Sequence, residues 1–118
     1  QVQCVLPRVL ARRGAAVTVL PLYRTEPDPA GLAALRRACA ARAVDLIAFT
    51  SSSTAESILA GPRGLPRRLR RGVRAVSIGP VTSRALRRLG MAPVAEARPS
   101  TLAGLVAAIM RYHRRCRP

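Results

Sequence analysis

The sequence predicts an α/β fold in which a parallel sheet is flanked by helices. Short apolar or β-branched runs alternate along the chain with segments whose apolar residues recur at helical spacing. Such alternation at short intervals is typical of parallel strands joined by crossover helices. With 118 residues, of which 49% are hydrophobic, the chain is long enough for one modest domain with its own core.

The first expected elements are a helix, a short strand and a second helix. Apolar residues repeat at helical spacing over residues 5–13, which predicts a helix ending before Gly14. Residues 17–20 are apolar or β-branched and predict a short strand. Asp28 followed by Pro29 predicts the start of the second helix, because Asp is a favoured N-cap and Pro suits the first helical position.

Two strands and a third helix are expected in the middle of the chain. Residues 44–50 and 73–78 are rich in apolar residues and predict buried strands. The run Ser51–Thr54 follows the first of these strands, and Glu56 stands three residues after Ser53. This spacing predicts a capping box that opens a helix.

The C-terminal third continues the same alternation. A helix is expected to run from Gly79-Pro80 to Gly90, where glycine would close it. Residues 92–95 predict a short fourth strand. Ser100 is expected to cap a last amphipathic helix, and the basic tail from Arg111 is expected to fray.

The formal net charge of +16 makes nucleic-acid binding a candidate function. The composition argues against it, because every basic residue is Arg and because Ala, Arg, Gly and Pro dominate, as in a biased codon pool. The Gly/Pro/Arg-rich connection at residues 61–72, with room for one short helix, contains the basic run 67–71. That run carries no aromatic side chain on which bases would stack. A solvated face is the favoured role of this run and of residues 111–117.

The residue types exclude several other classes of site. Three cysteines stand far apart and His113 is the only histidine, so the ligand spacing of a structural metal site is missing. The odd cysteine count and the lack of a signal peptide favour reduced thiols in a cytoplasm. No apolar stretch approaches the roughly 18 residues of a membrane span. Gln1 in place of an initiator Met is expected of a truncated or processed chain.

Hydroxyl residues follow three of the expected strands. In an open parallel sheet, ligands gather at the carboxyl ends of the strands, where helix N-termini favour anions. Taken singly, Ser53 and Ser100 are better explained as N-caps and Tyr23 as a rim residue, whereas Thr82 is balanced between binding and packing. Taken together, three junctions predict a site for a ligand with several carboxylates, at Ser51–Thr54, Gly79–Ser83 and Ser100-Thr101.

Four segments, in order, resemble the C-terminal half of uroporphyrinogen-III synthase. Each segment alone is a weak motif, but their order and spacing over residues 8–112 are specific. The segments are residues 14–17 running into 22–25, residues 44–52, residues 78–86 ending at Gly90, and residues 99–101 with 104–106.

The resemblance implies a fold of two α/β domains joined by a connector, with the active site in the cleft between them. By that resemblance, residues 1–20 correspond to the end of the inserted second domain and residues 21–26 to the interdomain connector. Residues 27–118 correspond to the returning portion of the first domain. The N-terminal half of the enzyme, including the first strand of the sheet, would be a missing partner of this chain.

The resemblance also implies a hydro-lyase of haem biosynthesis. The family cyclises hydroxymethylbilane, a linear tetrapyrrole with eight carboxylates, to uroporphyrinogen III. Water is lost, the terminal pyrrole ring is inverted, and no metal or organic cofactor takes part. Tyr23 matches the tyrosine thought to help the hydroxyl leave, and Val81 replaces a second threonine present in some members. The substrate-binding residues implied are Ser51, Ser52, Gly79, Pro80, Thr82, Ser100 and Thr101.

Two other functions are compatible with the same residues. The chain would be a non-catalytic tetrapyrrole-binding remnant if it kept half of the cleft but did not turn over. It would be a basic nucleic-acid-binding module if the arginines were selected for phosphate contacts.

Overall fold

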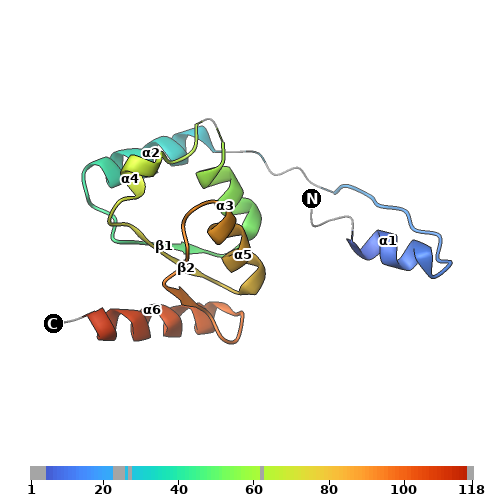
Figure 1. The fold of residues 1–118 in the computed structure, drawn as a ribbon. Coiled ribbons are helices and arrows are strands. Elements are labelled where there is room, and N and C mark those ends of the chain that lie inside the picture. The colour runs from blue at the N-terminus through green and yellow to red at the C-terminus, as the bar shows by residue number, and fades with distance from the viewer. Residues whose placement is uncertain (1–4, 23–25, 27, 62, 117–118) are drawn as a thin grey trace.

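The computed structural model describes residues 5–22, 26, 28–61 and 63–116 (Figure 1). Helices and short strands alternate along these residues. The elements are α1 (Val5–Arg12), α2 (Pro29–Ala40), β1 (Leu46–Phe49), α3 (Ser52–Leu59), α4 (Arg67–Arg70), β2 (Arg74–Ser77), α5 (Pro80–Arg88), β3 (Ala95–Glu96) and α6 (Leu102–Cys116).

The three strands form one parallel sheet in the order β1-β2-β3. Leu46 of β1 stands opposite Arg74 of β2, and Val76 of β2 stands opposite Ala95 of β3. Because all three strands run in the same direction, their carboxyl ends meet at one edge of the sheet. The predicted α/β fold, a parallel sheet flanked by helices, is confirmed.

Helices cover both faces of the sheet. Phe49 and Ala75 pack with α2, α3, α4 and α5 on one face, and Val76 packs under α6 on the other (Figure 1). The buried residues of the larger core are Cys39, Phe49, Ala55, Leu59, Leu65, Val73, Ala75, Leu86 and Met91. Those of the smaller core are Val76, Ala97, Leu105 and Ala108.

The start of α2 is as predicted. Asp28 is the N-cap, and its side-chain oxygen accepts hydrogen bonds from the backbone N–H groups of Ala30 (3.1 Å) and Gly31 (3.0 Å). Pro29 occupies the first helical position, where its missing N–H costs no hydrogen bond. The short helix expected in the connection is also present as α4.

The start of α3 differs from the prediction. Ser51 is the N-cap, and its Oγ accepts a hydrogen bond from the backbone N–H of Thr54 at 3.1 Å. Ser53 lies inside the first turn of the helix, so the predicted capping box between Ser53 and Glu56 is wrong. Consecutive serines offer the same capping chemistry, and the point where the extended strand backbone ends selects among them.

The last helix also differs from the prediction at both ends. Thr101 is its cap, because its Oγ1 accepts from the backbone N–H of Gly104 at 3.1 Å, whereas Ser100 precedes the cap. The tail from Arg111 does not fray, since α6 continues to Cys116. Basic side chains in the last turn interact favourably with the helix dipole, which offsets their mutual repulsion.

Two of the predicted strands differ in the structure. Residues 17–20 form no strand, because a strand needs a hydrogen-bonding partner and these residues lie apart from the sheet (Figure 1). The strand expected at residues 92–95 forms instead at Ala95–Glu96. Pro93 has no N–H to donate, and pairing starts with Val94, whose N–H donates to the Ala75 carbonyl at 2.8 Å.

The segment that contains α1 projects away from the rest of the molecule (Figure 1). No residue of α1 is buried, and Val5 and Leu6 are 64% and 68% exposed. The radius of gyration is 16.8 Å, against about 13.5 Å for a compact chain of this length. The amphipathic α1 therefore contributes nothing to the core of the chain.

Candidate functional site

The three predicted junctions lie at the carboxyl edge of the sheet. Ser51 follows β1, Gly79 follows β2, and Ser100 lies in the loop between β3 and α6. The second and third loops are in contact, because a Cβ added at Gly79 would lie 2.6 Å from the Ser100 Oγ. The structure thus brings the loops after β2 and β3 together at one edge.

The first loop is held by a local network of hydroxyl groups. The Ser51 Oγ lies 2.8 Å from the Thr54 Oγ1 and 3.2 Å from the Ser53 Oγ, in addition to its bond with the Thr54 N–H. Ser51 and Ser52 are half-buried. A helix has four N–H groups without an intrahelical partner at its start, and the Ser51 cap takes up one of them. The remaining donors are suited to an anion such as a carboxylate.

The second loop enters α5 directly from Gly79, with Pro80 as the first helical residue. No side chain caps this helix end. Val81 is 49% exposed, whereas Thr82 is only 4% exposed. Val81 therefore presents an apolar side chain to solvent at the site, whereas Thr82 as a residue lies almost entirely within the protein.

Ser83, the residue after Thr82, belongs to a buried polar chain that the sequence did not predict. The Ser83 Oγ donates to the Glu96 carboxylate at 2.5 Å and lies 2.5 Å from the Ser77 Oγ. Ser77 and Ser83 are fully buried. This chain connects the ends of β2 and β3 to the first turn of α5. The available signal for it was Ser77, a serine between the apolar residues Val76 and Ile78.

The third loop is fixed by its own backbone. The Thr101 N–H donates to the Pro99 carbonyl at 2.8 Å, and the Thr101 hydroxyl caps α6. Gly104 packs so closely against the Pro99 carbonyl that a Cβ would collide with it. Ser100 and Thr101 remain exposed beside the second loop.

Tyr23 lies outside the described residues, so the structure does not place the predicted catalytic side chain. Among the residues that are described, no group of three His, Cys, Asp or Glu side chains is positioned to hold a metal ion. His113 lies in the last turn of α6, while the serine loops lie at the opposite end of that helix. Within the same residues, no helix is long and apolar enough to cross a membrane.

One arginine of the central basic run has an internal role. The Arg70 guanidinium donates to three backbone carbonyls, those of Leu59 (2.5 Å), Leu65 (2.7 Å) and Leu89 (3.0 Å). Burial lowers the pKa of Arg70, and the charge of Arg67 lowers it further. This arginine joins α3, α4 and α5, so the run is not simply a solvated face.

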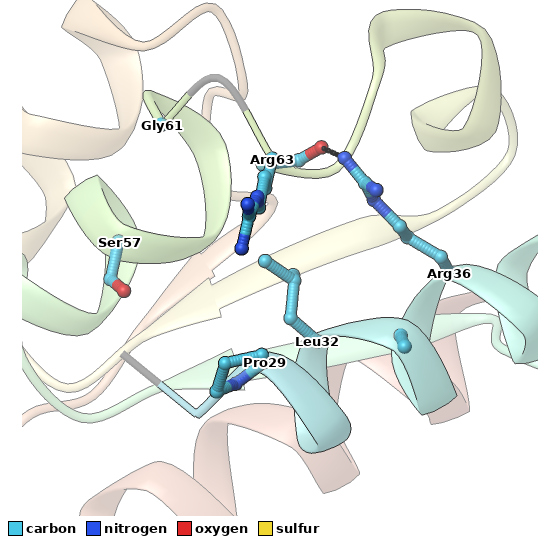
Figure 2. Close-up of a pocket in the computed structure, with 8 residues that line it drawn as sticks. Pro29, Leu32, Arg36, Ser57, Gly61 and Arg63 are labelled. Atoms are coloured by element: carbon cyan, nitrogen blue, oxygen red, sulfur yellow. Dashed lines mark hydrogen bonds between the residues drawn. The ribbon is translucent and has the colours of Figure 1, made fainter. Parts of the chain in front are cut away.

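One hollow lies away from the predicted site. It measures about 510 Å³ between α2, α3 and the loop after α3, and none of the predicted site residues lines it. Figure 2 shows the Arg63 side chain extending into it between Ser57 and Leu32. The Arg36 guanidinium donates to the Gly64 carbonyl at 2.7 Å at its edge.

A second hollow, of about 420 Å³, does reach the predicted site. It is a groove between α3 and α5 and includes Ser52, one of the predicted binding residues. The groove residues are Ser52, Glu56, Val81, Arg84, Arg87 and Arg88.

Comparison with known proteins agrees with this geometry. Residues 1–107 match the family model described as uroporphyrinogen-III synthase HemD. No curated protein matches the chain.

Solved structures of uroporphyrinogen III synthase from Thermus thermophilus are similar to the chain. The wild-type enzyme is 32% identical, with a TM-score of 0.67, over 94% of this chain and 45% of that one. A selenomethionine mutant form of it is 31% identical, with a TM-score of 0.72, over the same shares. A further structure is 32% identical over 91% and 44%, with a TM-score of 0.67. The chain thus spans less than half the length of these enzymes.

Proposed function

Because this chain belongs to the uroporphyrinogen-III synthase family, we propose that it forms part of a hydro-lyase that cyclises hydroxymethylbilane to uroporphyrinogen III. The reaction removes water and inverts the terminal pyrrole ring as the macrocycle closes. The buried thiol of Cys39, whose pKa is raised by burial, is compatible with a reduced, cytoplasmic setting.

The observation that carries the proposal is the carboxyl edge of the sheet. Three loops end there, two of them in contact through Gly79 and Ser100, and each leads into a helix N-terminus. Helix N-termini bind anions through free N–H groups and the helix dipole. A substrate with eight carboxylates has the chemistry that such an edge recognises.

Each predicted residue has a proposed role in the reaction. Tyr23 assists departure of the substrate hydroxyl as water. Ser51, Ser52, Ser100 and Thr101 present hydroxyl or backbone N–H groups to substrate carboxylates. Gly79 and Pro80 form a turn without a bulky side chain, so that the substrate approaches the backbone at the start of α5.

Thr82 has a more restricted part in the proposal. Thr82 is only 4% exposed, so its proposed part is limited to one hydrogen bond from its hydroxyl to a substrate carboxylate at the start of α5. Val81 stands beside it with an exposed apolar side chain, so a pair of hydroxyl contacts is not part of the proposal. Catalysis then rests mainly on positioning the reacting intermediate.

The site would be completed by a second part of the enzyme. We assign residues 1–20 to the end of the inserted domain, 21–26 to the connector and 27–118 to the returning portion of the first domain. The projection of α1 away from the sheet supports this division, since its exposed apolar stripe needs another partner. Both β1 and β3 are edge strands of the sheet, and an additional strand would pair with one of them.

The test is to assay the chain with hydroxymethylbilane, alone and mixed with the N-terminal half of a family member. We expect type III product only from the mixture, above the type I product that forms spontaneously, and association of the isolated chain in light scattering. Porphyrin binding without turnover in the mixture would instead identify a binding remnant. A stable monomer that makes type III product alone at ordinary enzyme rates would contradict the two-part site.

A further inference from the structure

We propose that the groove between α3 and α5 binds one carboxylate arm of the tetrapyrrole and so extends the binding site beyond the loops. This inference rests on the proposed function. It assigns a role to three arginines, Arg84, Arg87 and Arg88, that the family resemblance leaves without one.

The groove begins where the predicted site ends. Ser52 is the first residue of α3 and Val81 the second residue of α5, and both line the groove. Arg84 lies three residues further along α5, which is about 4.5 Å along the helix axis. A ligand held by the loops at the carboxyl edge therefore reaches the groove without crossing other parts of the protein.

The arginines are arranged on one side of α5. Arg84, Arg87 and Arg88 stand at positions i, i+3 and i+4, which are neighbours on a helix surface. Guanidinium groups bind carboxylates through paired hydrogen bonds. A volume of about 420 Å³ leaves room for a flexible carboxylate arm together with water.

The charges of the groove are unbalanced. Glu56 is the only acidic residue that lines it, against three arginines. The Arg88 Nη2 lies 3.8 Å from the Glu56 Oε1, and the two side chains are 75% and 55% exposed. An ion pair this long and this solvated contributes little. Among the described residues, Arg84 and Arg87 pair with no carboxylate, so the groove keeps an excess of positive charge.

The experiment uses uroporphyrin III, the air-stable oxidised form of the product, with the chain at low ionic strength, where exposed ion pairs are least screened. Binding is followed by porphyrin fluorescence. We expect the triple variant Arg84→Gln, Arg87→Gln, Arg88→Gln to bind about tenfold more weakly. We expect Glu56→Gln to bind about two- to threefold more tightly, because it removes the charge that competes for Arg88.

The matched control removes the same charge elsewhere, through Arg111→Gln, Arg114→Gln and Arg115→Gln on the exposed side of α6, and should bind like the parent chain. If both triple variants bind uroporphyrin III equally weakly, the effect is one of general charge, and the groove proposal is wrong. Parent-like binding by the groove variant would also overturn it, while leaving the proposed function intact. If the parent chain fails to bind uroporphyrin III even when mixed with the N-terminal half of a family member, both the proposed function and the groove proposal are wrong. Melting temperatures confirm that every variant is folded.

Discussion

Gly79 and Ser100 meet across the carboxyl edge of the sheet. A Cβ added at Gly79 would lie 2.6 Å from the Ser100 Oγ and 3.3 Å from the Ser100 Cβ. The backbone of Gly79 is extended, with φ 174° and ψ −179°, so close approach and not a special conformation is what favours glycine here. The contact fixes the spacing between the loops that enter α5 and α6.

Gly79→Ala should therefore destabilise the chain modestly. The Ser100 hydroxyl can rotate away but its Cβ cannot, so we expect a loss of about 1 kcal/mol. For a chain of this size that corresponds to a fall in Tm of about 4 °C. Adding Ser100→Gly should restore most of the loss. If it does not, the two loops are not in contact in the way described.

Ser83→Ala should lower the free energy of unfolding by more than the substitution of an average exposed serine does. The change leaves the buried Ser77 hydroxyl without its Ser83 partner and removes a hydrogen bond to Glu96. We expect a loss of about 1–3 kcal/mol in the free energy of unfolding, measured by denaturant titration. Ser53→Ala, at an exposed position in α3, is the control and should cost less than about 0.5 kcal/mol.

The double variant Ser77→Ala, Ser83→Ala tests whether the two hydroxyls act as one unit. Removing both partners of a buried hydrogen bond is less costly than leaving one unsatisfied. We expect the double variant to be destabilised by less than the sum of the two single variants. Strict additivity would argue against the network.

Thr82→Val separates binding from packing at the start of α5. If the hydroxyl contacts a substrate carboxylate, loss of one hydrogen bond to a charged group weakens binding by roughly 1.5–3 kcal/mol. We expect this result, with Tm nearly unchanged because valine has almost the same shape. The affinity for uroporphyrin III and the Tm are measured on the same samples. A lower Tm with unchanged affinity would assign Thr82 to packing alone.

Tyr23→Phe is the test of the proposed catalytic residue in the complete two-part enzyme. The phenylalanine keeps the ring but removes the hydroxyl that is proposed to help water leave. We expect slower ring closure and a lower ratio of type III to type I product, with the melting temperature unchanged. If neither the rate nor the ratio changes, Tyr23 has no part in the reaction.

The order and type of most elements could be predicted from local signals in the amino-acid sequence. Asp28 and Pro29 located the start of α2, and the apolar runs located β1 and β2. These signals are local, because capping, turn formation and helical periodicity depend on residues a few positions apart. The three junctions at the carboxyl edge followed from the same signals, since parallel strands end at one edge.

The partners of the polar groups depend instead on how these segments pack in three dimensions. The tertiary structure selected Ser51 over Ser53 as a cap and joined Ser77, Ser83 and Glu96 into one buried chain. It also directed Arg70 to three carbonyls. Each outcome depends on partners from different elements, which spacing along the chain does not specify. The same reason applies to residues 17–20, which have the sequence pattern of a strand but do not form one. A strand forms only with a neighbouring strand to which it can hydrogen-bond.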